Sequence, residues 1–421
     1  MNQESKNGPP CILVIGGGIA GLTAAIEAAE AGLGVVLVEK SPYLGGRAIG
    51  FNLYFPKLCP PTCGFEINLR RIKNHPLVTV LAPAELEELA GTPGKYEATV
   101  RVAPRYVTES CTLCGACAAV CPADMRDEFN LGLSRTKAAY LPHSMAYPPL
   151  YTIERNACQA GCAACLVACR YGAINLEQKV ERKKFQVAAV IVATGWKPYD
   201  AARIANLGFS KFPNVLTNVE LERLAAPNGP TRGRILRPSD GQAPLSVAFV
   251  QCAGSRDENH LPYCSTVCCS ASLKQSTYIH TLYPDARVAI FYIDVRTPGL
   301  LEEFRAKVAA NARLTLVKGK VGKIEEDADS HDLLVTVEDV LAGKKTIQRF
   351  SLVVLATGMV PQTEDLPLNL ARDPFGFVTN QTPGLYGAGC AKRPEEVSAA
   401  VRDSTGAALR AMQCAVRGKH G

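Results

Sequence analysis

The stretch "CILVIGGGIAGLTAAIEAAEAGLGVVLVEK", residues 11–40, decides the fold class of this chain. An apolar segment at 11–15 runs directly into Gly16-x-Gly18-x-x-Gly21, an alanine-rich segment follows, and a second apolar segment ends at Glu39. This order predicts a strand, a glycine turn, a helix and a second parallel strand. The glycines permit the tight turn, the approach of backbone amides to a pyrophosphate, and close packing of helix on strand. The stretch therefore predicts a βαβ unit that binds a nucleotide.

The residues after this unit favour FAD over NAD as the nucleotide. Glu39 stands where an acidic side chain can accept hydrogen bonds from both ribose hydroxyls of an adenosine, and Lys40 follows it. Just beyond, "SPYLGGRA" places Gly45, Gly46 and Arg47 as they occur in two-dinucleotide-binding flavoproteins. We therefore expect these five residues to contribute to a flavin site.

Three later segments also resemble parts of such flavoproteins. The apolar runs "VAAVIVATGWKP" and "FSLVVLATGMVP" each end in Ala-Thr-Gly, as do the strand-turns that close these nucleotide folds. The segment "PGLYGAGCA", which contains Gly389, resembles the strand whose following acid meets the ribityl chain, but Cys390 replaces that acid here. The expected cofactor contacts from these segments are Thr194, Gly195, Thr357, Gly358 and Gly389.

The composition of the chain bounds its class. With 421 residues, 47% hydrophobic and 20% charged, it is long enough for two or three units of a compact α/β enzyme. The net charge of +7 includes no run of Lys or Arg, so we assign no nucleic-acid role. The apolar runs are too short for a membrane helix and the N-terminus has no signal-like segment, which predicts a cytoplasmic protein. In that compartment, 17 cysteines indicate metal ligation rather than disulfides.

The first cysteine group lies in "ESCTLCGACAAVCPADM", residues 109–125. Its spacing, Cys111-x2-Cys114-x2-Cys117-x3-Cys121-Pro, is that of bacterial ferredoxins, in which the fourth cysteine ligates the other of two clusters. We therefore expect a [4Fe-4S] cluster here and a second group of ligands downstream.

The second group is "CQAGCAACLVAC", with Cys158, Cys162, Cys165 and Cys169. Its first gap has three residues instead of two, and Arg170 stands where proline is typical. A crossed pattern would join Cys169 to the first three cysteines of the first group and Cys121 to the first three of the second. The alternative for this group is a relict site or a zinc site.

The third group occupies the place where a second nucleotide unit would bind NAD(P)H. In "SVAFVQCAGSRDENHLPYCSTVCCSASLK" the strand and helix are present, but the glycine-rich turn is absent. Four thiols stand there instead, Cys252, Cys264, Cys268 and Cys269. They could be metal ligands or buried structural cysteines.

Several motifs now identify a family. The segments "QCAGSRD", "YCSTVCCSASLK", "RPSDG" and "FPKLCPPTC", with the ferredoxin run inside a flavin domain, resemble the A subunit of heterodisulfide reductase over nearly the whole chain. The resemblance implies that the third group binds a further [4Fe-4S] cluster. It also implies that Lys274 lies near the flavin ring, where its charge would favour an anionic reduced flavin.

Within this family the chain most resembles the A subunit of the quinone-interacting membrane-bound oxidoreductase complex of sulfate reducers. That resemblance implies an electron-transfer subunit between a quinone-linked module and adenylylsulfate reductase. It further implies a second flavin and iron-sulfur subunit, a heme-bearing membrane subunit, and a position at the inner membrane through these partners. The alternatives are an NAD(P)H-dependent disulfide reductase using Cys59 and Cys63, or a scaffold with vestigial cofactors.

We thus predict a thioredoxin or glutathione reductase-like α/β flavoprotein with an inserted two-cluster ferredoxin-like domain. The insert is expected at 106–175 and a second Rossmann-like domain at 241–345. The FAD domain takes the remaining residues, 1–105, 176–240 and 346–421. Residues 224–244 are expected to connect it to the second Rossmann-like domain.

Overall fold

The structure is a computed structural model that describes residues 10–417, and the chain divides into two units. Unit 1 comprises Met1–Ile49, Thr62–Trp196 and Pro361–Gly421, and unit 2 comprises Gly50–Pro61 and Lys197–Val360. Within the described part of the chain, no helix is long and apolar enough to cross a bilayer.

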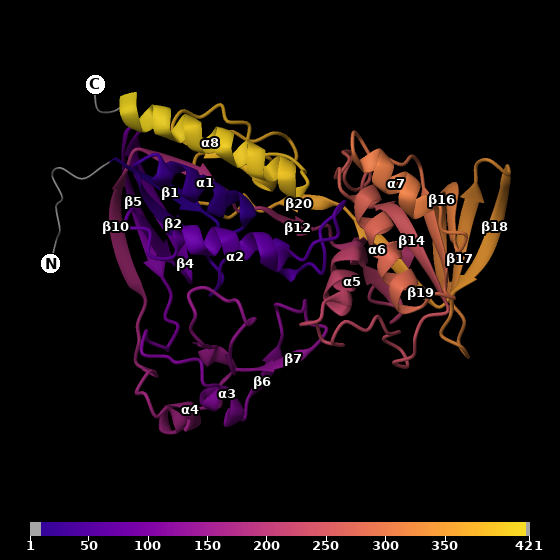
Figure 1. The fold of residues 1–421 in the computed structure, drawn as a ribbon, viewed down its shortest axis with the longest axis horizontal. Coiled ribbons are helices and arrows are strands. Elements are labelled where there is room, and N and C mark those ends of the chain that lie inside the picture. Colours follow the sequence, from indigo (N-terminus) through magenta and orange to yellow (C-terminus); the bar gives the residue numbers. More distant parts are fainter. Residues whose placement is uncertain (1–9, 418–421) are drawn as a thin grey trace. The chain divides into compact units, whose positions relative to one another are not determined.

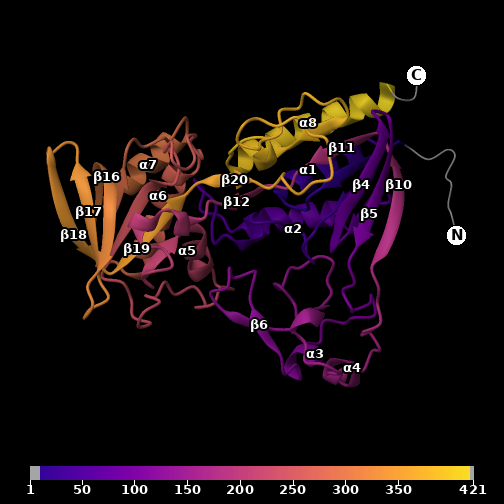
Figure 2. The same ribbon diagram turned by 180° about the vertical axis from the view of Figure 1, so that it is seen from behind.

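Unit 1 is built on a parallel sheet in the order β21-β11-β1-β2-β3 (Figure 1). Its central strand β1 is completely apolar at its buried positions because both faces of the sheet are covered. Ile12 and Val14 face the helices, whereas Leu13 and Ile15 face an antiparallel sheet in the order β10-β5-β4. Figure 2 shows the three long strands of this second sheet. The strands of the parallel sheet are β1 (Cys11–Ile15), β2 (Gly34–Val38), β3 (Val78–Leu81), β11 (Ala189–Val192) and β21 (Leu385–Gly387). The other elements are α1 (Ile19–Glu30), α2 (Pro61–Ile72), α8 (Val397–Arg417), β4 (Ala84–Thr92), β5 (Lys95–Val102) and β10 (Glu181–Val187).

The cysteine-rich insert is part of unit 1 and lies between β5 and β10 in the chain. These two strands pair antiparallel, with Val102 opposite Glu181, so both ends of the insert meet at one edge of the host sheet. The insert has a small core of its own, in which Val107, Ala138 and Ile153 pack beside buried cysteines. Its elements are short: α3 (Ala116–Ala119), β6 (Asp124–Arg126), β7 (Arg135–Lys137), β8 (Ala139–Tyr140), β9 (Thr152–Ile153) and α4 (Ala164–Ala168).

Unit 2 contains a mixed sheet in the order β13-β19-β14-β15-β16-β17-β18. Five strands, β13 to β16 in this order, run parallel, and the last two are antiparallel additions. The elements are β13 (Val215–Thr217), α5 (Asn218–Ala225), β14 (Ser246–Ala253), α6 (Cys268–Leu282), β15 (Arg287–Tyr292), α7 (Leu301–Ala309), β16 (Leu314–Glu326), β17 (Leu333–Asp339), β18 (Lys344–Phe350) and β19 (Leu352–Thr357). The chain passes between the units at β12 (Trp196–Pro198) and β20 (Met359–Pro361), which pair with each other.

The limits of the units differ from the predicted domain limits. The chain changes from one unit to the other at 196–197 and at 360–361. The predicted limits of the second Rossmann-like domain were instead 241 and 345. The reason is that β13 and β19 belong to the sheet of unit 2. The segment Gly50–Pro61 joins unit 2 through hydrogen bonds from the Asn52 amide to Glu222 of α5 and from the Leu53 amide to Tyr278 of α6.

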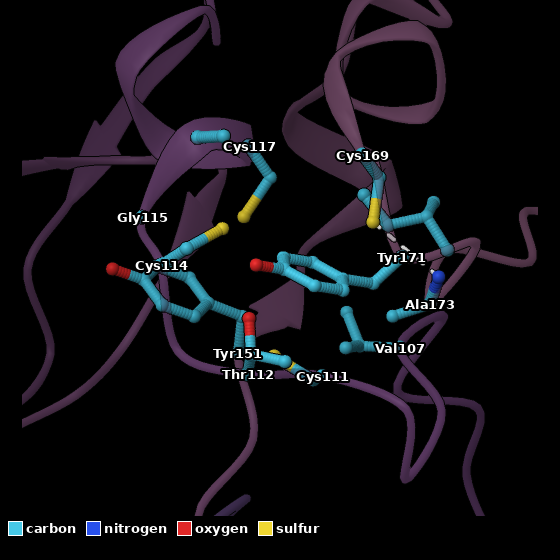
Figure 3. Close-up of a pocket in the computed structure, with 12 residues that line it drawn as sticks. Val107, Cys111, Thr112, Cys114, Gly115, Cys117, Tyr151, Cys169, Tyr171 and Ala173 are labelled. Carbon is cyan, nitrogen blue, oxygen red and sulfur yellow. Dashed lines mark hydrogen bonds between the residues drawn. The ribbon is translucent and has the colours of Figure 1, made fainter.

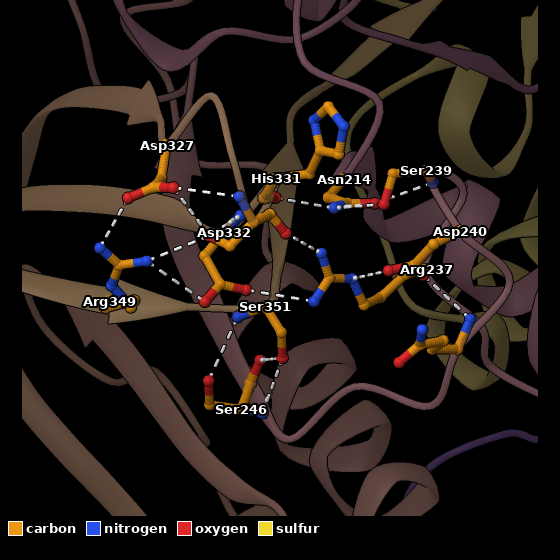
Figure 4. Close-up of polar contacts among 12 residues, drawn as sticks. Asn214, Arg237, Ser239, Asp240, Ser246, Asp327, His331, Asp332, Arg349 and Ser351 are labelled. Atoms are coloured by element: carbon orange, nitrogen blue, oxygen red, sulfur yellow. Dashed lines mark hydrogen bonds and ion pairs between the residues drawn. The ribbon is translucent and has the colours of Figure 1, made fainter.

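A polar network fixes the predicted connector, residues 224–244, to the β16–β17 turn of unit 2 (Figure 4). Arg237 donates to Asp332, while Arg349 donates to Asp327 and Asp332. The Asn214 amide donates to the His331 carbonyl oxygen at 2.9 Å. Backbone donation from Ser330 and the Arg349 guanidinium hold the pKa of Asp327 well below its ordinary value. These acids are thus satisfied by neighbouring arginines and amides, which indicates a structural role.

One buried arginine ties the insert to its host within unit 1. The Arg105 guanidinium donates to the carbonyl oxygens of Pro42 and Ala82 at 2.6 and 2.9 Å. It also donates to Thr152 Oγ1 at 3.1 Å and to the Leu150 carbonyl at 3.4 Å. Burial lowers the pKa of Arg105 to about 10, so the group stays charged at neutral pH.

Replacing Arg105 by methionine should loosen the insert, because buried carbonyls lose their donor. We expect the insert to lose about 2–4 kcal/mol of local stability. Trypsin cleaves the opened form of the insert, so its rate follows the population of that form. A loss of about 2 kcal/mol raises this population about 30-fold, and cleavage should become faster by at least that factor. The control is Arg182→Met, which removes an exposed ion pair with Glu87 and should change cleavage little. Equal cleavage of both variants would contradict the anchoring role.

Candidate functional site

The glycine turn of unit 1 is shaped by close contacts that exclude side chains. Gly16 has φ +106°, and a Cβ placed there would lie 2.4 Å from the Ala193 carbonyl oxygen. A Cβ on Gly21 would lie 1.8 Å from the Gly16 carbonyl oxygen, so this glycine lets α1 pack on the turn. Gly18, the N-cap of α1, has only Gly46 within reach of a Cβ, at 3.8 Å. The turn therefore combines close packing at two glycines with an accessible backbone at the third.

Glu39 reaches back to this turn from the end of β2. Its two carboxylate oxygens accept from the Gly17 amide at 2.6 Å and the Ser41 amide at 2.7 Å. Burial raises the pKa of the Glu39 carboxyl, and the amides of Ser41 and Gly17 oppose that shift. Each oxygen keeps a lone pair for a further donor, so the carboxylate can still accept from ribose hydroxyls. The neighbouring Lys40 is exposed and pairs with Glu85 of β4 at 2.9 Å instead of contacting the turn.

Other predicted flavin contacts gather around the same turn. The Gly45 amide donates to the Gly17 carbonyl at 2.8 Å, and Arg47 donates to the Trp196 carbonyl. The Thr194 hydroxyl oxygen is buried and has no hydrogen-bond partner within residues 10–417. A buried hydroxyl without a partner costs about 1–3 kcal/mol, which a ligand atom or water would offset. The glycine cradle and this hydroxyl together fit a dinucleotide.

The segment at Gly389 completes this environment through a residue that sequence reasoning missed. Gly389 has φ +57°, and its Cβ position lies 2.9 Å from Ala20 at the start of α1. Its amide donates to the Asp403 carboxylate at 3.0 Å. Asp403 comes from α8 and stands beside the turn where Cys390 replaces the expected acid. No local motif marks Asp403, because only the packing of α8 brings it there.

The second Ala-Thr-Gly motif lies elsewhere. Thr357 ends β19 in unit 2, and its hydroxyl donates to Asn218 Oδ1 at 3.2 Å. The Cys268 thiol donates to the Thr357 carbonyl at 3.7 Å, and Gly358 packs against Ser255. The structure thus places Thr357 and Gly358 beside the third cysteine group, in the unit that does not hold the glycine turn. Both motifs form strand-turns, but β11 and β19 belong to different sheets.

The two cysteine groups of the insert exchange their last members. A cavity is lined by Cys111, Cys114 and Cys117 of the first group and Cys169 of the second (Figure 3). Tyr171 also lines it, and its ring points between these sulfurs (Figure 3). The Ala173 amide donates to the Cys169 sulfur at 3.3 Å, as amides do to cluster sulfurs. This is the set of four that the crossed ferredoxin pattern predicts.

The remaining four thiols of the insert form a second set. Burial raises the pKa of Cys158, and the neighbouring thiols Cys121 and Cys162 raise it further, while Arg155 lowers it. Burial also raises the pKa of Cys165, and the thiols of Cys158 and Cys162 add to that shift. Cys158 thus lies within electrostatic range of Cys121 and Cys162, and Cys165 within range of Cys158 and Cys162.

The third group converges in unit 2, although its members are spread over residues 252–269. Cys252 lies at an irregularity of β14 with φ +56°, and Cys268 and Cys269 begin α6. Burial raises the pKa of Cys252 to about 11, with Cys269 and Cys264 adding to the shift. Burial raises that of Cys268 well above its ordinary value, with contributions from the other three thiols. Cysteine is the ligand that soft metal clusters prefer, so the residue type at these four positions suits such a cluster. Within residues 10–417 the four side chains are not drawn together closely enough to enclose a single metal ion.

Lys274 lies six residues along α6 from Cys268 and is buried. Its ammonium donates to the Leu53 carbonyl at 2.6 Å and pairs with Glu222 of α5 at 2.9 Å. The Glu222 carboxylate also accepts from Gln275 at 2.6 Å and from Tyr278 at 3.2 Å. Sequence reasoning missed Glu222, which has no motif and meets Lys274 only through helix packing. The predicted position of Lys274 near the flavin ring stays a prediction.

Cys59 and Cys63 carry free, exposed thiols. Cys59 lies in the segment of unit 2 that precedes α2, and its thiol donates to the Lys57 carbonyl at 3.8 Å. The structure brings neither into one of the three sets of four.

Two family models match parts of the chain, "FAD dependent oxidoreductase" at residues 12–56 and "4Fe-4S binding domain" at 104–127. The chain is 36% identical over 98% of its length to the A subunit of ferredoxin:CoB-CoM heterodisulfide reductase from Methanosarcina mazei. It is 38% identical over 94% of its length to the iron-sulfur A subunit of CoB–CoM heterodisulfide reductase from Methanocaldococcus jannaschii. The chain is a homologue of the heterodisulfide reductase A subunit. It spans 54% of the first relative and 63% of the second.

Solved structures support the fold of this heterodisulfide reductase homologue. Thioredoxin reductase of T. acidophilum superposes with a TM-score of 0.52 at 14% identity, covering 96% of this chain and 98% of that one. The Lactococcus lactis enzyme gives the same TM-score and identity, with 97% and 99% covered. These likenesses confirm the predicted thioredoxin reductase-like fold. The family matches confirm the predicted FAD and [4Fe-4S] cofactors and the oxidoreductase class.

Replacing Gly21 by alanine should abolish flavin binding, since the added Cβ would collide with backbone of the turn. We expect the flavin content after gel filtration to fall at least about tenfold, a loss of about 1.4 kcal/mol or more in binding. Gly64→Ala is the matched control, because a Cβ there meets open space on α2 and helix propensity favours alanine. Full flavin content in the Gly21 variant would refute the proposed site.

Proposed function

We propose that this chain is an electron-transfer subunit that holds one FAD and three [4Fe-4S] clusters. The observation that carries the proposal is that twelve cysteines gather in three places. In the insert, Cys169 of the second group lines one cavity together with the first three cysteines of the first group. FAD, when bound, supplies a cofactor that can exchange electrons in pairs or singly with one-electron clusters. The proposed metal ligands are Cys111, Cys114, Cys117 and Cys169; Cys158, Cys162, Cys165 and Cys121; and Cys252, Cys264, Cys268 and Cys269.

The protein's own residues bind and shield these groups. In the insert, Cys117, Cys121 and Cys165 are buried, which keeps water from their sulfurs. Arg155 places positive charge beside the second set and donates to the Cys162 carbonyl at 3.3 Å. Around the glycine turn, Glu39 and the partly buried backbone of Gly18 would hold and orient the adenosine part of FAD.

The physiological setting that we propose is sulfate respiration. The chain would relay electrons between a quinone-linked membrane module and adenylylsulfate reductase. Two partners, one with flavin and iron-sulfur clusters and one with heme, would hold it at the cytoplasmic face of the membrane. The support for this setting is the sequence resemblance described above. The names of the relatives, which are A subunits of CoB–CoM heterodisulfide reductases, support only the coarser proposal of a subunit in a larger redox complex.

An NAD(P)H-dependent disulfide reductase using Cys59 and Cys63 is the second candidate, favoured by the thioredoxin reductase-like fold. The turn after β14, where such an enzyme would bind NAD(P)H, argues against this candidate. A Cβ on Gly254 would lie 2.6 Å from the Tyr199 ring, so the space beside this turn is filled by the protein itself. Cys252 and the other thiols stand where a pyrophosphate would need glycine amides.

Rapid mixing under anaerobic conditions separates the two functions. We expect reduced methyl viologen, a one-electron donor, to bleach both cluster and flavin absorbance, whereas NADPH should leave both unchanged within the same time. The double variant Cys59→Ser, Cys63→Ser should respond like the wild type, because neither thiol belongs to a cluster set. Prompt flavin bleaching by NADPH, with thiol release that the double variant lacks, would establish the disulfide reductase instead.

A further inference from the structure

Two arginines and one aspartate border the third cysteine set in unit 2. Arg256 follows β14 in a tight turn with φ +55°, and its amide donates to the Tyr263 carbonyl at 3.1 Å. Asp294 and Arg296 follow β15. Because β14 and β15 are parallel neighbours, the segments after their carboxyl ends lie at the same edge of the sheet. The cysteine set lies at this edge as well.

The aspartate holds both guanidinium groups. Arg256 donates to one oxygen of Asp294, and Arg296 donates to the other at 3.2 Å. Arg256 lowers the pKa of the Cys252 thiol against the larger effect of burial, and Cys264 adds to the rise in the pKa of Arg296 that Asp294 causes, so each arginine lies near one thiol of the set.

The main chain of the same segment adds a further contact. The Cys269 thiol donates to the Asp294 carbonyl oxygen at 3.7 Å. Cys269 therefore joins the set directly to the segment that carries Asp294 and Arg296, and Arg256 is held to the same segment by its ion pair with Asp294.

Charged side chains border the third set directly, whereas the first set of the insert has one buried arginine, Arg105, within electrostatic range of Cys111 but not in the lining of its cavity. The residues lining the cavity of Cys111, Cys114, Cys117 and Cys169 include tyrosines and small apolar residues but no charged side chain. At the third set, two positive charges and one negative charge lie beside the thiols. Reduction of a thiolate-bound cluster adds negative charge, which nearby positive charge stabilises.

We propose that Arg256 and Arg296 raise the reduction potential of the cluster bound by Cys252, Cys264, Cys268 and Cys269, and that Asp294 offsets part of their charge. The inference rests on the proposed function, since it requires a cluster at this set. It assigns the two arginines as tuning residues that make this cluster a better electron acceptor than its thiolates alone would.

The test is an anaerobic redox titration of the whole protein with its cofactors, followed by EPR. The signal of this cluster is assigned by its loss in Cys268→Ser. We expect the double variant Arg256→Gln, Arg296→Gln to have a more negative midpoint potential. At a fixed potential, the ratio of oxidised to reduced cluster should rise at least tenfold, which corresponds to a shift of about 59 mV for one electron. The paired lysine variants should keep most of the wild-type potential. Asp294→Asn should shift it in the opposite, positive direction.

Arg313→Gln serves as the control, since it removes an exposed arginine that pairs with Asp285 in the same unit and should leave the midpoint unchanged. An unshifted midpoint in the double glutamine variant with full iron content would overturn the inference. So would lysine variants that shift as far as the glutamine variants, because the effect would then be structural. If the EPR spectra of the wild type and of Cys268→Ser were the same, no cluster would be bound at this set. That result would contradict the three-cluster function on which the inference rests.

Discussion

The crowding and partial burial of thiols in three groups is the constraint on which this structure depends: five of the twelve are buried, and one, Cys114, is exposed. Burial raises the pKa of a thiol because it disfavours the charged thiolate, and the charge of a neighbouring thiolate raises the pKa further. Both effects act on Cys158, Cys252 and Cys268. Such sets are unfavourable as thiolates unless a cation lies among them. A cluster supplies that charge, so the loops that carry the cysteines are shaped for it. The irregularity of β14 at Cys252 is one result, since it directs this thiol toward the start of α6.

The position of the insert gives these sets a host. β5 and β10 pair with each other and with β4, so the insert can vary without disturbing the parallel sheet on the other side of Leu13 and Ile15. Arg105 then fixes the insert by donating to host carbonyls as well as to Thr152. The two cysteine sets of the insert and the glycine turn thereby lie in one unit, while the third set lies in unit 2.

Local patterns predicted what depends on local chemistry. The glycine spacing predicted β1, the turn and α1, and the cysteine spacing predicted the exchange of Cys169 into the first set. The second Ala-Thr-Gly motif was assigned to the flavin domain, yet β19 pairs with β13 and β14. A strand-turn motif encodes its own backbone and does not encode its partner strand. Asp403 and Glu222 escaped prediction for a similar reason, because tertiary packing alone brings each to its partner.

The central claim is that all three sets bind clusters while the glycine turn binds one flavin. Its most direct test is the iron, zinc and flavin content of anaerobically purified protein. The account predicts about twelve irons and one FAD per chain, without zinc. About eight irons, or zinc in place of iron, would contradict it and leave at least one set of four thiols as a structural feature.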